Sequence, residues 1–242
     1  MTDLISYAKE IIDKSKSIVV LTGAGISKDS GIPTFRGEDG LWKQYSPQEL
    51  ANPDAFFRNP KLVWQWYNWR RELISKAKPN PGHLALHKLE LIKEEFLLIT
   101  QNVDGLHSKA GNRKLIEFHG NIWKEKCVQC DFKRYNEVIY KEDDLPPACP
   151  VCGSLIRPDI VWFGEAVPFE NIQKSFEALS RCDTMLSVGT SGVVYPAAAL
   201  VEYAVKTAKK VIEINYERTP FSDFVDVSIQ ERASVLLPRL IE

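Results

Sequence analysis

Four short apolar runs recur along the sequence, and each gives way to glycine or small polar residues at its carboxyl end. Segments with helical spacing of apolar residues separate the runs, and this alternation is typical of an α/β protein with a parallel sheet. In such a sheet the ligand lies in the crevice beyond the carboxyl ends of the strands, so the polar residues there should converge. The runs, each with its expected crevice residue, are 17–20 with Gly23, 95–100 with Asn102, 184–188 with Ser191 and 210–214 with Asn215.

The first run ends in a tight turn, Gly23-Ala24-Gly25, which should lead into the start of a helix. Glycines let backbone N–H groups approach an anion, and the unpaired N–H groups at a helix start supply partial positive charge. The turn is therefore suited to holding phosphate. The loop after it carries Phe35, Arg36 and Trp42, an aromatic–cation–aromatic set suited to closing over a nucleotide.

Two features of this turn depart from the usual dinucleotide-binding fingerprint. Lys28 replaces the third glycine of G-x-G-x-x-G, and no acidic residue ends a strand about 20 positions later. The glycine turn alone is thus weak evidence for dinucleotide binding. The ribose of a nicotinamide dinucleotide would instead be held by a late strand end, such as residues 213–217.

Two Cys-x-x-Cys pairs predict a metal site. Cys127 and Cys130 are separated by 18 residues from Cys149 and Cys152, a spacing typical of a four-cysteine zinc ribbon. Four thiolates complete a tetrahedral shell, so the zinc would be structural and not catalytic. A nucleic-acid-binding ribbon is the alternative. However, residues 123–156 contain five Lys or Arg against six Asp or Glu, a balance without an electrostatic footprint for nucleic acid.

Charge and cysteine usage favour a cytoplasmic protein. The net charge of -1 gives no general attraction to nucleic acid or membranes. Residues 1–17 have the pattern of an amphipathic helix and not of a signal peptide, and no later run approaches the roughly 18 apolar residues of a membrane span. Paired cysteines that suit a metal fit a reducing compartment, and the fifth, Cys182, is expected to be a packed thiol.

The segment 46–77 should be helical, and its last helix carries two adjacent stripes of side chains. One stripe, predicted to be core, is Leu62, Trp66, Trp69 and Leu73; the other is Val63, Tyr67, Arg70 and Ile74. In the second stripe a phenol and a guanidinium, three residues apart, could point at one ligand atom. The alternative is an arginine that reaches outward or pairs with a structural carboxylate. Nearby, His83 and His87 could hold a metal, although histidines that only pack are commoner.

A set of short motifs then occurs in a fixed order along nearly the whole chain. The motifs are Gly23-Ala24-Gly25-Ile26-Ser27, Gly31-Ile32-Pro33 with Phe35-Arg36, Thr100-Gln101-Asn102-Val103-Asp104, Phe118-His119-Gly120, the four cysteines, Trp162-Phe163-Gly164-Glu165 and Gly189-Thr190-Ser191. This ordered set resembles the sirtuins, the NAD-dependent protein lysine deacylases. One departure is Thr34, where many members of the family have aspartate.

The resemblance implies an α/β fold with two domains. A Rossmann-like NAD-binding domain, with helices on both faces of a parallel sheet, would comprise residues 1–44, 80–123 and 157–242. A helical module, 45–79, and a zinc-ribbon module, 124–156, would form the small domain. NAD, consumed as a co-substrate, would lie in the cleft between them, and the four cysteines would hold one structural Zn²⁺.

The resemblance also assigns the NAD contacts to three parts of the chain. The pyrophosphate and nicotinamide side would be held by Gly23, Ala24, Ile32, Phe35, Arg36 and Trp42. Gln101, Asn102, Val103 and Asp104 would surround the nicotinamide ribose. The adenosine half would contact Gly189, Thr190, Ser191, Asn215, Tyr216, Glu217 and Ala233.

By the same resemblance, the catalytic residues are His119, Asn102 and Asp104. His119 is the candidate base, because the unperturbed pKa of histidine lies near working pH and a ribose hydroxyl must lose a proton after nicotinamide leaves. The products would be free lysine, nicotinamide and 2′-O-acyl-ADP-ribose. An acyl-lysine protein or peptide would pair by β-augmentation with an extended segment, Val161, Trp162, Phe163, Gly164 and Glu165.

Tyr67-x-x-Arg70 resembles the sirtuin branch that removes acidic acyl groups such as succinyl and malonyl. A guanidinium on an apolar wall beside a phenol can bind a distal carboxylate in bidentate fashion, and Ala51 leaves room there. Deacetylation remains an alternative. Two other readings stay open: a protein ADP-ribosyltransferase that uses the same NAD site, and a non-catalytic NAD-sensing or nucleic-acid-binding module.

Overall fold

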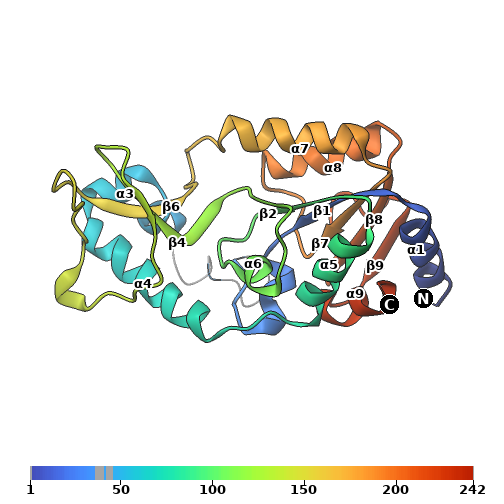
Figure 1. The fold of residues 1–242 in the computed structure, drawn as a ribbon, viewed down its shortest axis with the longest axis horizontal. Coiled ribbons are helices and arrows are strands. Elements are labelled where there is room, and N and C mark those ends of the chain that lie inside the picture. Colours follow the sequence, from blue (N-terminus) through green and yellow to red (C-terminus); the bar gives the residue numbers. More distant parts are fainter. Residues whose placement is uncertain (1, 36–40, 42–45, 242) are drawn as a thin grey trace.

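The protein consists of a large and a small part joined side by side (Figure 1). The computed structural model describes residues 2–35, 41 and 46–241, so the predicted contacts of Arg36 and Trp42 lie outside the described residues. The large part is built on a parallel sheet and the small part on an antiparallel one. The domain boundaries given above stay a prediction.

The six strands of the large sheet run parallel in the order β3-β2-β1-β7-β8-β9. In chain order this is 3-2-1-4-5-6, the arrangement of doubly wound dinucleotide-binding folds, and the direction of winding reverses between β1 and β7. Thr22 at the end of β1 pairs with Thr100 of β2 and Val188 of β7, so three strand ends are level. The strands are β1 (Ser17–Thr22), β2 (Glu95–Thr100), β3 (Leu115–Glu117), β7 (Thr184–Val188), β8 (Lys210–Asn215) and β9 (Val227–Gln230).

Helices cover both faces of this sheet, as predicted. Successive residues of a strand point to opposite faces, and in β1 Ile18 and Val20 face one apolar cluster while Val19 and Leu21 face another. On one face lie α1 (Thr2–Lys14), α5 (Pro81–Ile92) and α9 (Ala233–Leu240), and on the other α7 (Phe169–Arg181) and α8 (Ala197–Lys206) (Figure 1). The short helix α6 (Leu106–Ala110) follows β2.

The small part combines three helices with a three-stranded antiparallel sheet in the order β5-β4-β6. Two helices begin with proline behind an asparagine cap: the Asn52 side chain accepts from Ala55 N–H, and that of Asn59 from Leu62 N–H. The elements are α2 (Pro47–Leu50), α3 (Pro53–Arg58), α4 (Pro60–Lys76), β4 (Gly120–Cys127), β5 (Lys133–Tyr135), β6 (Ile156–Ile160) and the 3₁₀ turn Glu142–Asp144.

The buried face of α4 differs from the prediction. Of the stripe predicted to be core, only Trp66 is buried, and the Leu62 side chain is 43% exposed. The second stripe, Val63, Tyr67, Arg70 and Ile74, is fully buried. The prediction that the first stripe is core was wrong for Leu62, because α4 turns the second stripe toward the apolar cluster of the small part. α4 has 17 residues, and no helix among the described residues is long and apolar enough to cross a membrane.

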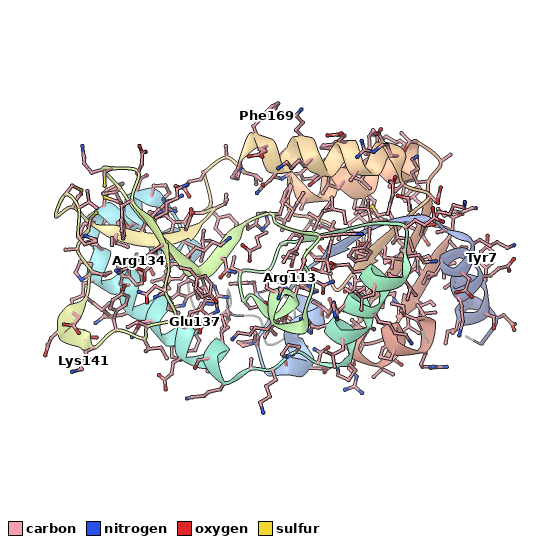
Figure 2. All side chains as sticks on the ribbon, viewed as in Figure 1. Tyr7, Arg113, Arg134, Glu137, Lys141 and Phe169 are labelled. Atoms are coloured by element: carbon pink, nitrogen blue, oxygen red, sulfur yellow. The ribbon has the colours of Figure 1, made fainter. Side chains whose placement is uncertain are left out.

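A buried ion pair fixes α4 to the small sheet. Arg71 donates from Nη1 to Glu125 Oε1 at 2.9 Å, and from Nε and Nη2 to the Ile122 carbonyl. Arg134 of β5 donates to the second Glu125 oxygen at 2.7 Å, at the end of the molecule opposite Tyr7 of α1 (Figure 2). Leaving one partner of such a pair alone in the interior costs about 3–5 kcal/mol, so the pair firmly ties helix to sheet.

Two neighbouring strands lead from the small sheet back to the large part. β4 follows β3 almost directly, and the chain after β6 runs to α7 (Figure 1). They pair where they leave, at Gly120 and Ile160. A Cβ at Gly120 would lie 2.1 Å from the Asp159 carbonyl oxygen, so the two connections touch through their backbones.

Three glycines let the ends of β1 and β7 meet. Gly25 N–H donates to the Gly189 carbonyl at 2.8 Å, and a Cβ on Gly25 would lie 2.7 Å from Gly189 Cα. A Cβ on Gly23 would lie 2.7 Å from the Gly189 carbonyl oxygen, and Gly189 itself has a φ of 59°. The glycines therefore serve contact between two strand ends, in addition to the approach to an anion that the sequence suggested.

We expect Gly25→Ala to lower the free energy of unfolding by about 3 kcal/mol, because the new methyl group meets rigid backbone. Gly31→Ala is the matched control. Nothing lies within 4 Å of its Cβ position, and only its φ of 82° disfavours a side chain, at a cost of about 1 kcal/mol. Urea unfolding measures both losses; equal losses would mean that the β1 and β7 loops separate at no cost.

Candidate functional site

The carboxyl ends of the large sheet form the predicted crevice. Asn102 donates from Nδ2 to the Gly23 carbonyl at 3.0 Å, and Gln101 from Nε2 to Thr190 Oγ1 at 2.8 Å. Side chains that follow β2 thus hold the loops that follow β1 and β7. Ser191 follows β7, and Asn215 is the last residue of β8, at the same edge.

After β1 the chain forms a 3₁₀ helix, Ala24–Ser30, whose start faces this crevice. The Gly25 N–H is committed to Gly189, whereas the Ala24 N–H has no partner among the described residues. A free N–H at a helix start fits an anionic group. Ile32 is buried in the apolar cluster of the small part, and Phe35 packs against that cluster.

Not every polar side chain of residues 213–217, where the ribose was expected to bind, is available to a ligand. The Glu213 carboxylate is buried and accepts hydrogen bonds from Thr219, Ser222 and Ser228, so it cannot hold a ribose. Tyr216 is exposed, with Lys28 Nζ 5.8 Å from the centre of its ring. Of the residues at this strand end, Asn215, Tyr216 and Glu217 therefore stay the predicted adenosine contacts. Ala233, a further predicted contact, is buried at the start of α9.

His119 lies between β3 and β4 with one ring nitrogen held in place. Its Nδ1 is 3.2 Å from the Gln101 carbonyl oxygen, which can only accept, so Nδ1 carries the hydrogen. The lone pair is then on Nε2. Burial lowers the pKa of His119, and the bond to Gln101 opposes this only in part. The ring is therefore neutral at pH 7 and able to accept a proton.

A polar network behind the crevice joins two predicted catalytic residues through a serine that the sequence analysis did not select. Ser27 donates to Asp104 Oδ2 at 2.8 Å and accepts from Asn102 Nδ2 at 3.2 Å. Leu106 N–H donates to the other Asp104 oxygen at 2.8 Å. Burial raises the pKa of Asp104, against the effect of these hydrogen bonds. Ser27 stands in the Gly-Ala-Gly-Ile-Ser motif, which was the available signal.

His83 completes this network and is no metal ligand. Its Nδ1 accepts from Asn80 N–H as part of the cap of α5, and its Nε2 lies 3.4 Å from Ser27 Oγ. Burial lowers the pKa of His83 to about 4, so the ring is neutral. Among the described residues, the four cysteines are the only group of three or more side chains that could hold a metal.

Tyr67 and Arg70 are both buried in the small part, next to the loop after β1. The Arg70 guanidinium lies over the Phe35 ring at 4.7 Å and the Trp66 ring at 5.1 Å. Within the described residues no hydrogen bond or ion pair joins it to a carboxylate or carbonyl; burial lowers its pKa, and the charges of Tyr67 and Asp104 oppose this in part. Tyr67 Oη accepts from Trp162 Nε1 at 2.8 Å. Arg70 is buried, so the predicted alternative of outward reach is not observed; of the other alternative, pairing with a structural carboxylate, only an electrostatic interaction with Asp104 is found.

The segment predicted to be extended is in fact a turn. Glu165 N–H donates to the Trp162 carbonyl at 3.0 Å, and Gly164 has a φ of 85°. Phe163 is exposed at the tip, while its N–H donates to the Ala51 carbonyl at 2.9 Å. Only Val161, whose N–H donates to the His119 carbonyl, continues the line of β6. The expectation of an extended 161–165 segment was wrong because Gly164 permits the left-handed backbone that a tight turn needs.

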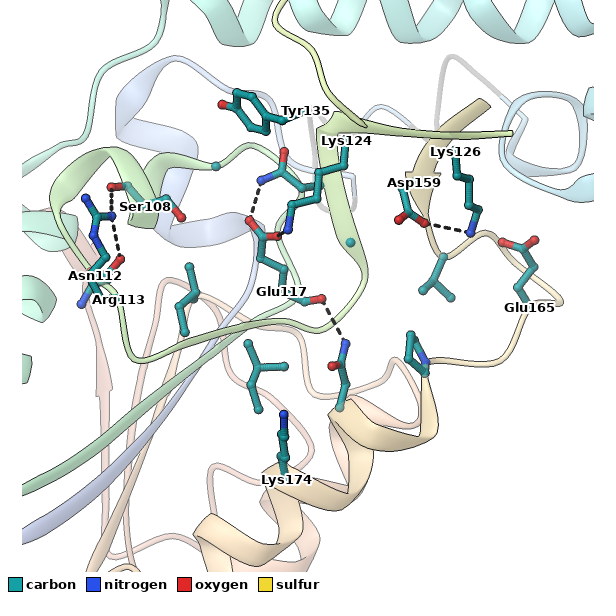
Figure 3. A pocket seen from close by; sticks show the side chains of 18 of the residues that line it. Ser108, Asn112, Arg113, Glu117, Lys124, Lys126, Tyr135, Asp159, Glu165 and Lys174 are labelled. Carbon is teal, nitrogen blue, oxygen red and sulfur yellow. Dashed lines mark hydrogen bonds and ion pairs between the residues drawn. The ribbon is translucent and has the colours of Figure 1, made fainter. Parts of the chain in front are cut away.

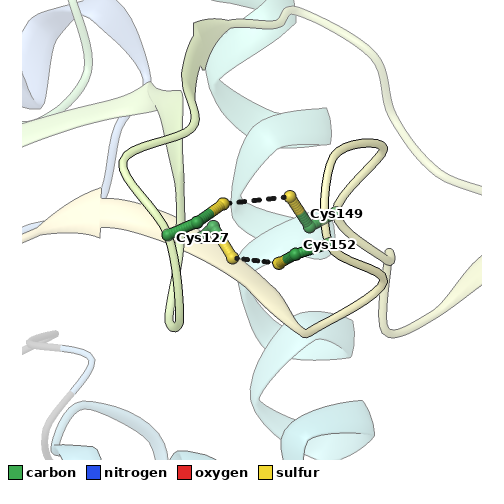
Figure 4. A group of neighbouring side chains, drawn as sticks. Cys127, Cys149 and Cys152 are labelled. Atoms are coloured by element: carbon green, nitrogen blue, oxygen red, sulfur yellow. Dashed lines mark hydrogen bonds between the residues drawn. The ribbon is translucent and has the colours of Figure 1, made fainter.

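The four cysteines fit one zinc ion. Their Sγ atoms all lie within 4.8 Å of one another, with 3.5 Å between Cys127 and Cys152 and 3.7 Å between Cys130 and Cys149 (Figure 4). A tetrahedron with Zn–S bonds of about 2.3 Å has S–S edges of about 3.8 Å. All four ligand positions would be filled, which leaves a structural role. Cys182 is buried elsewhere, under the sheet, as predicted.

A groove of about 830 Å³ lies between α6, β4 and the start of α7 (Figure 3). Two of the five cations that line it pair with carboxylates of its lining, Lys124 with Glu117 and Lys126 with Asp159. Its lining includes none of Gly23, Asn102 and Ser191, but it includes Gly120, directly after His119. The groove therefore adjoins the His119 segment, and cations outnumber carboxylates in its lining.

Comparison with known proteins assigns the chain to a family. The model of the Sir2 family matches residues 23–196, well over half of the chain. The chain belongs to the Sir2 family. It is 53% identical over 226 residues to the NAD-dependent protein deacylase of Aquifex aeolicus, covering 93% of this chain and 94% of the relative. This match confirms the predicted sirtuin resemblance.

Solved Sir2 structures also match in fold. A Sir2 homologue mutant in complex with 2′-O-acetyl ADP ribose has a TM-score of 0.91 and 43% identity, over 98% of this chain and 94% of that one. A Sir2–p53 peptide–NAD⁺ structure has a TM-score of 0.87 and 38% identity, over 96% and 94%. The predicted fold class is confirmed. The Tyr-x-x-Arg branch and the roles of single site residues stay predictions.

For this Sir2 protein we expect Cys127→Ser to release the metal and unfold the zinc ribbon, because binding free energy in such a site is folding free energy. Native mass spectrometry should show loss of one zinc, and hydrogen exchange should rise in 124–156 before it rises in the large sheet. Cys182→Ser, also at a buried cysteine, should keep the zinc. A Cys127→Ser protein without zinc whose ribbon stays protected would refute the structural role.

Proposed function

We propose that this protein is an NAD-dependent protein lysine deacylase. It would consume NAD as a co-substrate, act on acyl-lysine proteins or peptides and release free lysine, nicotinamide and 2′-O-acyl-ADP-ribose. The observation that carries the proposal is the neutral His119, whose Nδ1–H is held by Gln101 at the carboxyl edge of a sheet of the Sir2 family. A cytoplasmic location stays part of the proposal.

The positions of the residues in the crevice support this activity. The Ala24 N–H and the Gly23 loop would take the pyrophosphate, Gln101 to Asp104 the nicotinamide ribose, and Ser191 and Asn215 the adenosine side. Bound NAD supplies an electrophilic ribose carbon and nicotinamide as the leaving group. Asn102 and Asp104, joined through Ser27, would keep the ribose edge of the crevice fixed while the acyl oxygen approaches.

His119 would serve as the base. Its Nε2 lone pair would take a proton from a ribose hydroxyl, and its Nδ1–H would remain on the Gln101 carbonyl throughout, which holds the ring orientation. A purely binding module needs no neutral imidazole at this edge.

We further propose that the acyl pocket takes a negatively charged acyl group, such as succinyl or malonyl. Trp162 is a donor only, so Tyr67 accepts from it and keeps its own O–H for another partner. The Arg70 guanidinium has donors only as well; it lies against the Phe35 and Trp66 rings, and its interaction with Asp104 is electrostatic, with no hydrogen bond to a described residue. Two buried donors without an acceptor suit a carboxylate.

Acyl removal should depend on NAD and on the neutral form of His119. Acetylated and succinylated peptides, incubated with and without NAD, should yield free lysine only with NAD, and His119→Ala should nearly abolish turnover while peptide still binds. Because the pKa of His119 is lowered, kcat/KM should stay high as pH falls through about 6.5 and decline only below it. Lysine release without NAD, or transfer of labelled ADP-ribose to protein that exceeds deacylation, would overturn the proposal.

Arg70→Met should remove the preference for acidic acyl groups. Losing a charge-assisted hydrogen bond costs about 2 kcal/mol, so the ratio of kcat/KM for succinyl over acetyl peptide should fall roughly 30-fold. Arg181→Met, at an exposed arginine of α7 paired with Glu177, is the matched control and should leave the ratio unchanged. An unchanged ratio in Arg70→Met would exclude the carboxylate pocket.

A further inference from the structure

The Trp162 side chain belongs to the turn at 162–165 and yet reaches the acyl pocket. Its indole is buried beside Phe56, and its Nε1–H donates to Tyr67 Oη at 2.8 Å. An indole N–H cannot accept, so this contact fixes the direction of the hydrogen bond. Tyr67 therefore has its acceptor need met by Trp162 and keeps its own hydrogen for whatever else enters the pocket.

Arg157 holds the indole and the turn together. Its guanidinium stacks on the Trp162 ring at 3.4 Å and binds Glu165 through two hydrogen bonds of 2.5 and 2.8 Å. It also donates to the Ile160 carbonyl at 2.8 Å, and Trp162 N–H donates to Glu165 Oε2 at 2.9 Å. Bidentate bonding and stacking fix an arginine in both position and plane. The turn therefore sets where the indole N–H points.

The alternative donor for the Tyr67 oxygen is Arg70, one helical turn further along α4. A buried phenol oxygen that lost its donor would be left unsatisfied, which is costly. Arg70 would then turn toward Tyr67 to satisfy it, and the guanidinium would be drawn away from an incoming carboxylate. Trp162 removes the need for this by supplying a donor to the Tyr67 oxygen.

We propose that Trp162 is a specificity-determining positioning residue: its indole N–H keeps both Tyr67 and Arg70 available as donors for an acidic acyl group. The inference rests on the proposed deacylase function and deepens it. The proposed role of Trp162 connects the turn at 162–165 with the acyl pocket. The turn that would meet the peptide backbone would therefore also set acyl selectivity. Trp162 acts through Tyr67 and is not itself placed on the acyl carboxylate.

The test is a double-mutant cycle on acyl selectivity, the ratio of kcat/KM for succinyl over acetyl peptide. Effects of Trp162→Phe on the turn itself act on both peptides and cancel in this ratio. We expect Trp162→Phe to lower the ratio about five-fold, the equivalent of one buried hydrogen bond. In a Tyr67→Phe background, Trp162→Phe should cause no further change, because there is no phenol oxygen left to hold.

Trp64→Phe is the matched control. Trp64 is a buried tryptophan of the same apolar cluster, and it donates its indole N–H to the Ile156 carbonyl at 2.7 Å and not to Tyr67. This variant should leave the ratio as in the parent protein. The inference fails if Trp162→Phe leaves the ratio unchanged, or if it lowers the ratio equally with and without the Tyr67 hydroxyl.

A binding measurement distinguishes failure of the role proposed for Trp162 from failure of the proposed deacylase function. If no peptide is deacylated, the function is refuted, and the Kd values of fluorescein-labelled succinyl and acetyl peptides still report on the pocket. The ratio of the two Kd values should then change about five-fold on Trp162→Phe and not on Trp64→Phe. Equal Kd ratios in all variants would overturn the role of Trp162 whatever the activity.

Discussion

The backbone contact between Gly25 and Gly189 is the constraint on which the crevice depends. It joins the two loops on either side of the point where the winding of the sheet reverses, which is where doubly wound folds bind ligands. Asn102 and Gln101 then attach the end of β2 to the same two loops. Any side chain at Gly25 or Gly189 would part these loops and move the catalytic edge with them.

Much of the fold could be predicted because fully buried parallel strands leave a strong trace in sequence. The predicted runs at 95–100 and 184–188 coincide with β2 and β7, since strands covered on both faces are almost continuously apolar. The zinc ligands were predictable from spacing alone, because a ribbon draws its ligands from two local turns. The stripe on α4 was misjudged, because an apolar count cannot show that Arg70 and Tyr67 are buried while Leu62 is exposed.

Contacts across long stretches of chain could not be predicted from one sequence. Trp162 and Tyr67 are 95 positions apart, Ser27 and Asp104 are 77 apart, and Arg71 and Glu125 are 54 apart. The neighbouring residues in the sequence do not indicate the partner of any of these side chains, and only the folded structure shows it. The same holds for the turn at 162–165, where Gly164 could have ended a strand or reversed the chain. Its shape depends on Arg157 and Glu165, which close it from both sides.

The paired connections β4 and β6 also restrict how the two parts of the molecule can move. The two strands touch backbone to backbone at Gly120 and Ile160, and the apolar cluster of the small part also includes Val103 and Leu106 from the segment after β2. Twisting or swinging one part against the other would shear the hydrogen bonds between these strands or open the shared apolar cluster. His119 lies immediately before Gly120, and its carbonyl accepts from Val161 N–H at 2.9 Å, so the same two strands that join the parts also fix the backbone of His119.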